Sequence, residues 1–465
     1  MRRIIILIIS FLSVLTIKAS GKDTPIYPTG KNAVYRIYLK DKKGTPYSLN
    51  KPEKYLSKRS IARRKQQQLP VDSTDLPVNP AYVKTIRSNE VQVLGCSKWN
   101  NTVVIMTEKA KTVERLSTLP FVDNIILVWE EPKNNSMAPK RDSLRMMDLN
   151  KTVKDYYGSA QEQTEMLNGQ RLHEMGFKGR GMMIAVLDGG FMNVDSIPAF
   201  RNSNIIGARD FVRDRKANVY EQLDHGTKVL SLMATSMPNI YVGAAPEASY
   251  WLLRSEDGPT ESMAEEDYWA MAAEFADSVG CDVINSSLGY HEYDNKSTNY
   301  RYRDLTGRNA LISRTASMLA GKGIVHVNSG GNSGMGTWKK IGVPADATDI
   351  LAVGATNKER VNAAYSSVGP SADGRIKPDI VALGNPWLIS GRGMMTISSG
   401  TSFAAPQICG WVACLWQALP GKTAREILDL VRMSGDNTEY PDNIFGYGMP
   451  DFYNAYQMGK GEIDN

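Results

Sequence analysis

The stretch Gly400-Thr401-Ser402-Phe403-Ala404-Ala405-Pro406 places a serine between small residues, directly before a long apolar segment. That segment, residues 407–419, is apolar on nearly every face, which predicts a helix buried in the middle of a large domain. At the start of such a helix, unpaired N–H groups and the positive dipole end favour negative charge on a reacting group. Ser402 is therefore a candidate nucleophile. The alternative is a Ser/Thr cap on a core helix.

The chain has 465 residues, which predicts two domains, one of them with a substantial core. Its first residues, Met1-Arg2-Arg3, precede an apolar run at 4–17 and then Lys18-Ala19-Ser20. These are the three zones of a secretory signal peptide, which we place at residues 1–20. An uncleaved anchor is the alternative, although the apolar run is short for a membrane span. We expect a secreted protein, periplasmic or extracellular, with no membrane contact beyond the signal peptide.

The formal net charge of +6 is unevenly distributed along the chain. Residues 22–66 contain thirteen Lys and Arg against three Asp and Glu, so this front segment alone carries +10. With the front segment and the three basic residues of the signal peptide set aside, everything after residue 66 sums to −7. The large downstream region therefore gives no charge argument for a nucleic-acid partner.

Four cysteines, Cys96, Cys281, Cys409 and Cys414, are too few for a disulfide-built scaffold. Cys409 and Cys414 lie five residues apart on the predicted core helix, a spacing that points them in different directions. We interpret them as small buried hydrophobic residues. One bridge in an oxidising compartment is the alternative.

Residues 22–132 predict a small α+β domain, because strand-like and helix-like patterns alternate there. Expected strands lie at 33–40, 102–106 and 122–129, and expected helices at 52–68 and 110–119. Residues 133–154 are polar and include Pro139 and Lys140-Arg141. That is the composition of a linker and a natural place for proteolysis.

Residues 155–460 have a different sequence pattern, in which short apolar runs alternate with helical patterns. Continuous apolar runs fit strands buried on both faces of a parallel sheet, so the pattern predicts a doubly wound, mostly parallel α/β domain. Ligands bind beyond the carboxyl ends of the strands in such domains. The expected strands include 183–187, 283–285, 324–327 and 350–353, and the expected helices 227–235, 262–279 and 310–320.

Two candidate catalytic residues follow from that rule and from a helix start. Asp188-Gly189-Gly190 comes directly after the first apolar run, where a carboxylate can accept a hydrogen bond from an imidazole. His225, followed by Gly226-Thr227, opens a helix, and histidine is the usual general base because its pKa lies near neutrality. The alternative for Asp188 is a simple Asp-Gly turn, and the alternative for His225 is a helix cap or a surface group.

The glycine-rich stretch at 328–334 follows another apolar run and contains Asn332. Its side-chain NH₂ group could donate to an oxyanion formed on a reacting carbonyl. A phosphate-binding loop is the alternative interpretation of such a stretch. Neither G-x-x-x-x-G-K-[ST] nor a helix-opening G-x-G-x-x-G is present, which argues against phosphate.

Asp188, His225, Asn332 and Ser402 together supply every part of acyl transfer by a serine, in the chain order Asp, His, Ser. Residues 155–458 resemble the catalytic domain of the subtilisin-like serine peptidases. The motifs that carry the resemblance are Ile184-Ala185-Val186-Leu187-Asp188-Gly189-Gly190, His225-Gly226-Thr227-Lys228-Val229 and the Gly400–Pro406 stretch. The resemblance implies a serine endopeptidase that acts on protein or peptide substrates and needs no cofactor for its chemistry.

The resemblance carries further expectations. Ser287-Leu288-Gly289 and Ser329-Gly330 correspond to the two segments that flank bound peptide in that family. The front segment is similar in size and position to the family's propeptide, which implies a zymogen inhibited by its own propeptide. Family members often bind structural calcium. Asp195, Asp210 and Asp214 are candidate ligands, but no loop is specific enough to name a metal site.

The sequence departs from the family pattern at three positions. Gly189 stands where Ser or Thr is usual, Phe403 where Met is usual, and Leu383 where Pro often precedes the glycine. None of these changes removes a reacting atom. A secreted binding or structural protein that keeps the fold without turnover is the main alternative. A metallopeptidase is disfavoured, because H-E-x-x-H and paired Cys-x-x-Cys are absent from the sequence.

Overall fold

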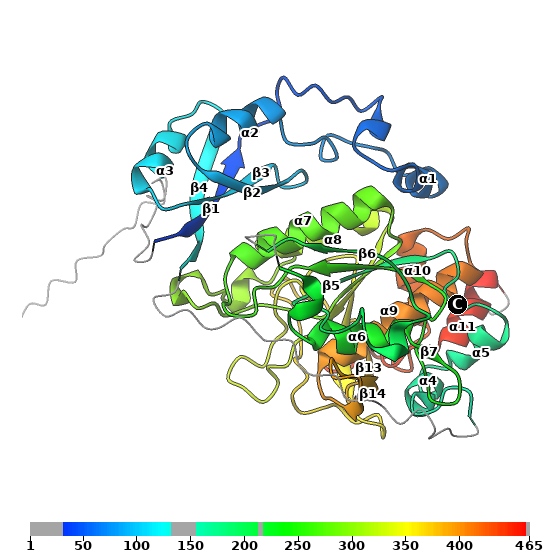
Figure 1. Cartoon of the computed structure of the whole chain (residues 1–465). Coiled ribbons are helices and arrows are strands. Elements are labelled where there is room, and N and C mark those ends of the chain that lie inside the picture. Colours follow the sequence, from blue (N-terminus) through cyan, green and yellow to red (C-terminus); the bar gives the residue numbers. More distant parts are fainter. Residues whose placement is uncertain (1–30, 132–154, 213–216, 462–465) are drawn as a thin grey trace, which may run out of the picture.

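The computed structural model describes residues 31–131, 155–212 and 217–461. The predicted signal peptide and the predicted linker at 133–154 lie outside the described residues. A four-stranded antiparallel sheet forms the N-terminal region, and a seven-stranded parallel sheet with surrounding helices forms the rest (Figure 1). The predicted α/β fold with a small α+β region in front is therefore confirmed.

The N-terminal sheet has the strand order β2-β3-β1-β4. Three of its strands and helix α3 were predicted, whereas β2 and α2 were not. The sequence of strand β2 does not show a regular strand pattern, because Gly95 interrupts it at a register shift against β3. The elements are β1 (Ala33–Leu39), α2 (Pro80–Arg87), β2 (Gln92–Ser97), β3 (Thr102–Thr107), α3 (Ala110–Ser117) and β4 (Val122–Glu130).

The prediction of one continuous helix over residues 52–68 is wrong. The structure has a single 3₁₀ turn, Pro52–Lys54, followed by helix α1, Lys58–Gln66. Ser57 separates them, because its extended backbone (ψ 160°) starts a new helix and its hydroxyl accepts from the Ser60 N–H at 3.1 Å. A serine in this role is a favoured N-cap.

The large sheet has the order β13-β12-β11-β10-β5-β9-β6, and every neighbouring pair is parallel. The four predicted apolar runs correspond to β5, β10, β11 and β12, and the other three strands were not predicted. The strands are β5 (Met183–Asp188), β6 (Asn204–Asp210), β9 (Ser249–Arg254), β10 (Val283–Ser286), β11 (Val325–Ser329), β12 (Leu351–Thr356) and β13 (Ile380–Leu383).

The predicted helices of this region form with small changes at their ends. They are α6 (His225–Ala234), α7 (Ala264–Val279), α8 (Leu311–Met318) and α9 (Thr401–Ala418). The other α-helices of this region are α4 (Gln161–Glu165), α5 (Gln170–Glu174), α10 (Ala424–Met433) and α11 (Phe452–Lys460), and its short strands are β7 (Ser236–Met237), β8 (Tyr241–Val242), β14 (Trp387–Ile389) and β15 (Met395–Ile397). No helix of the described residues combines the length and apolar composition of a membrane span.

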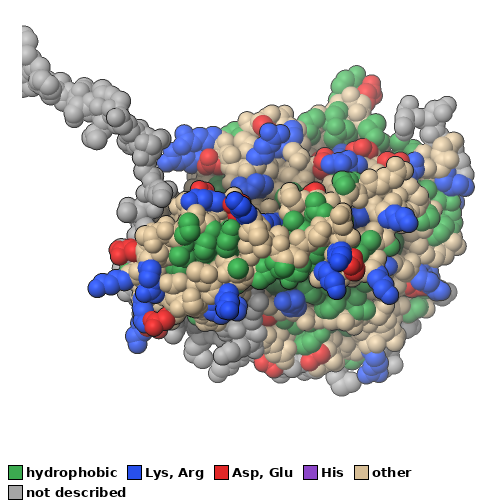
Figure 2. Space-filling view, turned by 90° about the horizontal axis from the view of Figure 1, so that it is seen from above, with side chains coloured by type: hydrophobic (Ala, Val, Ile, Leu, Met, Phe, Trp, Pro, Cys, Tyr) green, Lys and Arg blue, Asp and Glu red, His purple; other side chains and the backbone are tan. Residues whose placement is uncertain are grey.

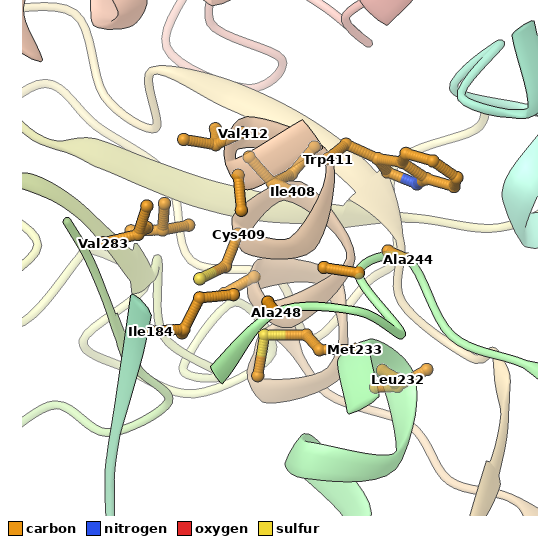
Figure 3. Close-up of a cluster of buried hydrophobic side chains, with 14 of the residues drawn as sticks. Ile184, Leu232, Met233, Ala244, Ala248, Val283, Ile408, Cys409, Trp411 and Val412 are labelled. Carbon is orange, nitrogen blue, oxygen red and sulfur yellow. The ribbon is translucent and has the colours of Figure 1, made fainter. Parts of the chain in front are cut away.

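Helix α9 runs through the main core, as its apolar sequence predicts. Figure 3 shows Cys409 facing Ile184 and Val283 of the sheet, while Trp411 leaves the helix on another side. Cys409 and Cys414 are fully buried, and all four cysteines are free thiols. Their prediction as small buried hydrophobic residues is confirmed.

The N-terminal region lies over α7, and its helix α1 contacts the C-terminal end of α7 (Figure 1). Arg63 and Arg64 of α1 both pair with the buried carboxylate of Asp277, at 2.6 and 2.8 Å. The side chains of Arg63 and Gln67 also donate to backbone carbonyls just before β10 and β11. Basic side chains are also scattered over the face in Figure 2. Part of the front segment's positive charge is thus neutralised by the acidic domain behind it.

Candidate active site

The carboxylate of Asp188 ends strand β5 and is 1% exposed. His225, the first residue of α6, places its Nδ1 at 3.0 and 2.9 Å from the two Asp188 oxygens. Because an ionised carboxylate only accepts hydrogen bonds, Nδ1 carries the proton in this pair. The other ring nitrogen, Nε2, is then free to accept a proton.

Two opposing effects set the pKa of His225. Burial lowers it, whereas the charge of Asp188 and the hydrogen bond to it raise it, and the outcome is a pKa raised to about 9. The imidazole lines a cleft at the carboxyl ends of the strands, and its side chain is 33% exposed. It must be neutral to accept a proton, so a raised pKa moves its use as a base toward alkaline pH.

Ser402 and Ser287 are joined by two reciprocal hydrogen bonds. The Ser402 hydroxyl donates to the Ser287 carbonyl oxygen at 3.0 Å, and the Ser287 hydroxyl donates to the Ser402 carbonyl oxygen at 2.9 Å. Pro406 explains the second bond, because it has no N–H for the carbonyl four residues earlier in α9. Within the described residues, no hydrogen bond joins the Ser402 hydroxyl to His225.

Thr401 fixes the orientation of the Asn332 side chain. The Thr401 N–H and hydroxyl both lie close to the Asn332 Oδ1, at 2.9 and 3.0 Å. A backbone N–H can only donate, so the amide oxygen must face Thr401. The NH₂ group of Asn332 is therefore left for another acceptor. Asn332 itself is exposed and lines the same cleft as His225.

One cleft of about 490 Å³ collects the predicted site residues. Ser287 directly follows β10 and Ser329 ends β11, and these two strands are parallel neighbours with Ser286 opposite Asn328. The two segments therefore run side by side. The predicted residues that line the cleft are His225, Ser287, Leu288, Gly289, Ser329, Gly330, Asn332 and Ser402, while Asp188 lies buried behind His225.

Two glutamates that were not predicted from the sequence, Glu256 and Glu261, line the same cleft. Glu256 comes two residues after the end of strand β9. A Cβ added to Gly189 would lie 3.1 Å from the Glu256 Oε2 and 2.8 Å from a methyl carbon of Leu223, so a Ser or Thr there would crowd both. The apolar run Tyr250–Leu253 was the available signal, because it puts Glu256 just beyond the carboxyl end of a strand.

Phe403, which stands where the family usually has Met, packs beside His225. Its ring centroid lies 5.5 Å from that of the His225 imidazole, and only 5% of the residue is exposed. The larger side chain therefore packs against the ring of the candidate base instead of filling the cleft.

The candidate calcium ligands do not form a recognisable site. Asp210 already pairs with Arg254 at 3.1 Å, and Asp214 lies outside the described residues. Among the residues described, no group of three or more His, Cys, Asp or Glu side chains is arranged to hold a metal ion. Structural calcium stays a prediction without a site.

Comparison with known families gives two matches, one to the larger part of the chain and one to the N-terminal part that precedes it. The first, to the subtilase family, covers residues 179–448, which is more than half of the chain. This chain belongs to the subtilase family. The second, to a peptidase S8 propeptide domain of Bacteroidota, covers residues 34–143. The protein is thus a subtilisin-like serine peptidase with a propeptide, as the motifs predicted, and subtilisin chemistry needs no cofactor.

Individual relatives of this subtilase are distant. It is 27% identical to Subtilisin NAT of Bacillus subtilis subsp. natto over 311 residues, which cover 66% of this chain and 74% of the relative. It is 28% identical to a subtilisin of Bacillus pumilus over 279 residues, covering 60% and 90%. Subtilisin-like protease SBT6.1 of Arabidopsis thaliana is 27% identical over 310 residues, covering 65% and 27%. The domain limits 22–132, 133–154 and 155–460 stay predictions.

Proposed function

We propose that this subtilase is a secreted endopeptidase in which Ser402 attacks the peptide carbonyl and His225 takes its proton. His225 then returns the proton to the leaving amine, while Asp188 holds the imidazole tautomer and stabilises the imidazolium. The observation that supports this most is the two-oxygen contact of Asp188 with His225 Nδ1, which leaves Nε2 for the cleft that contains Ser402.

The Ser402 hydroxyl must leave the Ser287 carbonyl oxygen before it can react. Staggered side-chain rotamers are about 120° apart, so one χ1 rotation redirects the hydroxyl within the cleft. Catalytic hydrogen bonds often tighten only when substrate is bound. We therefore assign the Ser402–Ser287 hydrogen bond to the resting state.

Asn332 and the backbone N–H of Ser402 are the proposed oxyanion donors. The Asn332 NH₂ group is not needed by Thr401, which contacts the amide oxygen. The Ser402 N–H belongs to the first turn of α9, where N–H groups have no intrahelical acceptor. Both donors are available for the negative oxygen of a tetrahedral intermediate.

The substrate would lie extended between Ser287-Leu288-Gly289 and Ser329-Gly330, which run side by side in the cleft. An extended peptide can add as a strand there through main-chain hydrogen bonds, with side chains entering pockets at alternate positions. Backbone recognition of this kind permits many sequences, so selectivity must come from the pockets.

The remaining expectations concern maturation. Residues 1–20 would direct export, and residues 22–132 would act as the intramolecular inhibitor until the chain is cut between Trp129 and Met147. Intact-mass analysis of the secreted, fully active protein should give an N-terminus inside that interval. An active chain that still begins near Lys22 would contradict the zymogen proposal.

A fluorophosphonate probe tests the catalytic assignment directly. The wild-type protein should become labelled on Ser402, and Ser402→Ala should lose labelling and peptide hydrolysis by about 10⁶-fold, the scale known for loss of the nucleophile in subtilisins. Ser297→Ala, at an exposed serine outside the cleft, is the matched control and should label normally. A wild-type protein that is folded but never labels would favour the alternative of an inert binding protein.

A further inference from the structure

Three glutamates gather at one side of the cleft, where Glu256 and Glu261 line it and Glu265 lies behind them. Within the described residues, none of the three forms an ion pair with Lys, Arg or His. Arg254, whose charge acts on Glu256, already pairs with Asp210 and lies 3.9 Å from Asp257. We call Glu256, Glu261 and Glu265 the acidic corner; its three carboxyl groups form no ion pair among the described side chains, although the charges of His225 and Arg254 act on Glu256.

Two buried polar atoms next to the acidic corner lack a hydrogen-bond partner, namely Glu265 Oε2 and the Tyr290 hydroxyl. Glu265 is 1% exposed and Tyr290 2%. The other Glu265 oxygen accepts from the Asp257 N–H at 2.6 Å, which fixes its carboxyl group beside Glu256. Tyr290 directly follows the cleft residue Gly289. Buried groups without partners are rare, so these two atoms behind the cleft lining leave hydrogen-bonding capacity unused beside Glu256 and Glu261.

The raised pKa values of the three glutamates favour the neutral carboxyl groups in the acidic corner. Burial, and then the charge of Asp188, raise the pKa of Glu256 to about 8, and burial with Asp294 raises that of Glu261 to about 7. Burial, and then the charges of Glu261 and Glu256, also raise the pKa of Glu265 well above its ordinary value. A cation that entered the corner would favour the charged carboxylates and release these protons.

We propose that the acidic corner is a specificity subsite that binds the Lys or Arg side chain of a peptide substrate. The proposal rests on the endopeptidase function proposed above. A guanidinium carries five donors in a planar fork, enough to reach separate carboxyl groups, and a lysine ammonium carries three. The described carboxyl groups do not converge tightly enough to hold one metal ion, which favours an extended organic cation.

The chain itself contains such side chains shortly after a segment that contacts Thr260, next to the acidic corner. The indole N–H of Trp129, at the end of β4, donates to the Thr260 hydroxyl at 3.0 Å, one residue before Glu261. The sequence that follows contains Lys140 and Arg141. The linker is therefore the first substrate that we expect this subsite to accept.

The test uses the active, self-processed enzyme and pairs of fluorogenic peptides that differ at one position only. Arginine is compared with citrulline, which has the same shape without the charge, at each position on the amino side of the scissile bond. At one position kcat/KM should be at least about tenfold higher for arginine, as expected for a partly buried charge pair. This preference should shrink as ionic strength rises.

Variants locate the effect. Glu256→Gln and Glu261→Gln should each lower the arginine-to-citrulline ratio by about tenfold. Glu292→Gln is the matched control, because Glu292 is 62% exposed, pairs with Lys296 and lies outside the cleft lining. It should keep the wild-type ratio.

Two outcomes overturn the inference in distinguishable ways. If the wild-type enzyme cleaves the citrulline peptides as well as the arginine peptides at every position, the subsite is refuted while the endopeptidase function stands. If neither peptide is cleaved and the fluorophosphonate probe does not label Ser402, both proposals fail. The wild-type comparison needs no variant, so a glutamine variant that does not fold leaves the test intact.

Discussion

The guanidinium of Arg36, in the propeptide sheet, forms three hydrogen bonds with the carboxylate of Asp267, in helix α7 of the peptidase domain. Nε lies 2.7 and 2.9 Å from the two oxygens, and Nη2 lies 2.7 Å from one of them. Both side chains are at most 2% exposed. Removing one partner of such a pair leaves an uncompensated buried charge, which costs about 3–5 kcal/mol.

We therefore expect Asp267→Asn to loosen the propeptide from α7. In the uncut Ser402→Ala background, the free energy of opening at the amides of β1 should fall by about 3 kcal/mol, measured by hydrogen exchange. Asp429→Asn, at a 70% exposed carboxylate, is the control and should change it by less than about 0.5 kcal/mol. Equal protection of β1 in both variants would contradict this.

The pH dependence of catalysis should reflect the pKa of His225. That pKa is raised to about 9, since the charge of Asp188, the hydrogen bond to it and the charge of Glu256 together outweigh burial. Only the neutral imidazole accepts the serine proton, so kcat/KM should be low in acid and rise to a plateau at alkaline pH. A profile from about pH 6 to about pH 11 with an uncharged peptide checks this. A midpoint at or below about 6.5, the ordinary pKa of histidine, would show that the pKa is not raised.

Glu256→Gln should move that midpoint downward. The negative charge of Glu256 is one of the contributions that raise the pKa of His225. Its removal favours the neutral imidazole, so the variant should reach its plateau at lower pH than the wild type. The comparison uses the same uncharged peptide, which separates this effect from the binding of cationic side chains. An unchanged midpoint would mean that Glu256 and His225 do not interact.

The Ser287–Ser402 contact predicts a rescue between two substitutions. In the inactive Ser402→Ala background, Ser287→Ala should lower the free energy of unfolding by about 1–3 kcal/mol, because the carbonyl oxygen of residue 402 loses its donor. Pro406→Ala restores a backbone N–H that can donate to this carbonyl. The double variant should recover part of the loss in a denaturant titration. Strictly additive effects would rule out the coupling.

Asn332→Asp tests the oxyanion donor without removing the contact to Thr401. The aspartate keeps an oxygen for the Thr401 N–H and hydroxyl but has no NH₂ group. We expect kcat to fall by at least about 10²-fold with little change in KM, the scale known for loss of such a donor in subtilisins. A change in KM alone, with kcat unaltered, would show that Asn332 is not an oxyanion donor.

The strand-end rule explains which parts of this site the sequence could predict. Asp188 and Asn332 follow short, continuous apolar runs, so the order of residues along the chain was enough to predict their positions. Glu256 follows an apolar run that includes Tyr250 and Trp251, so the same rule applies to it. It was nevertheless not predicted as a site residue.

Other features depend on contacts that no local pattern encodes. The direction of the Ser402 hydroxyl depends on the position of the Ser287 carbonyl oxygen, 115 residues away in sequence. The pairing of Arg63 with Asp277 spans 214 residues. The uneven charge of the chain was visible in the sequence, but only the structure shows that the two charged regions bind each other.

Helix α1 lies at the amino ends of β10 and β11, whereas the cleft lies at their carboxyl ends. The propeptide thus binds the peptidase through contacts that cleavage of the linker leaves unchanged. After cleavage the propeptide is no longer linked to the peptidase but remains bound to it. It is then lost only by dissociation on dilution or by digestion. Activation would then lag behind cleavage, and the lag would lengthen as the protein becomes more concentrated.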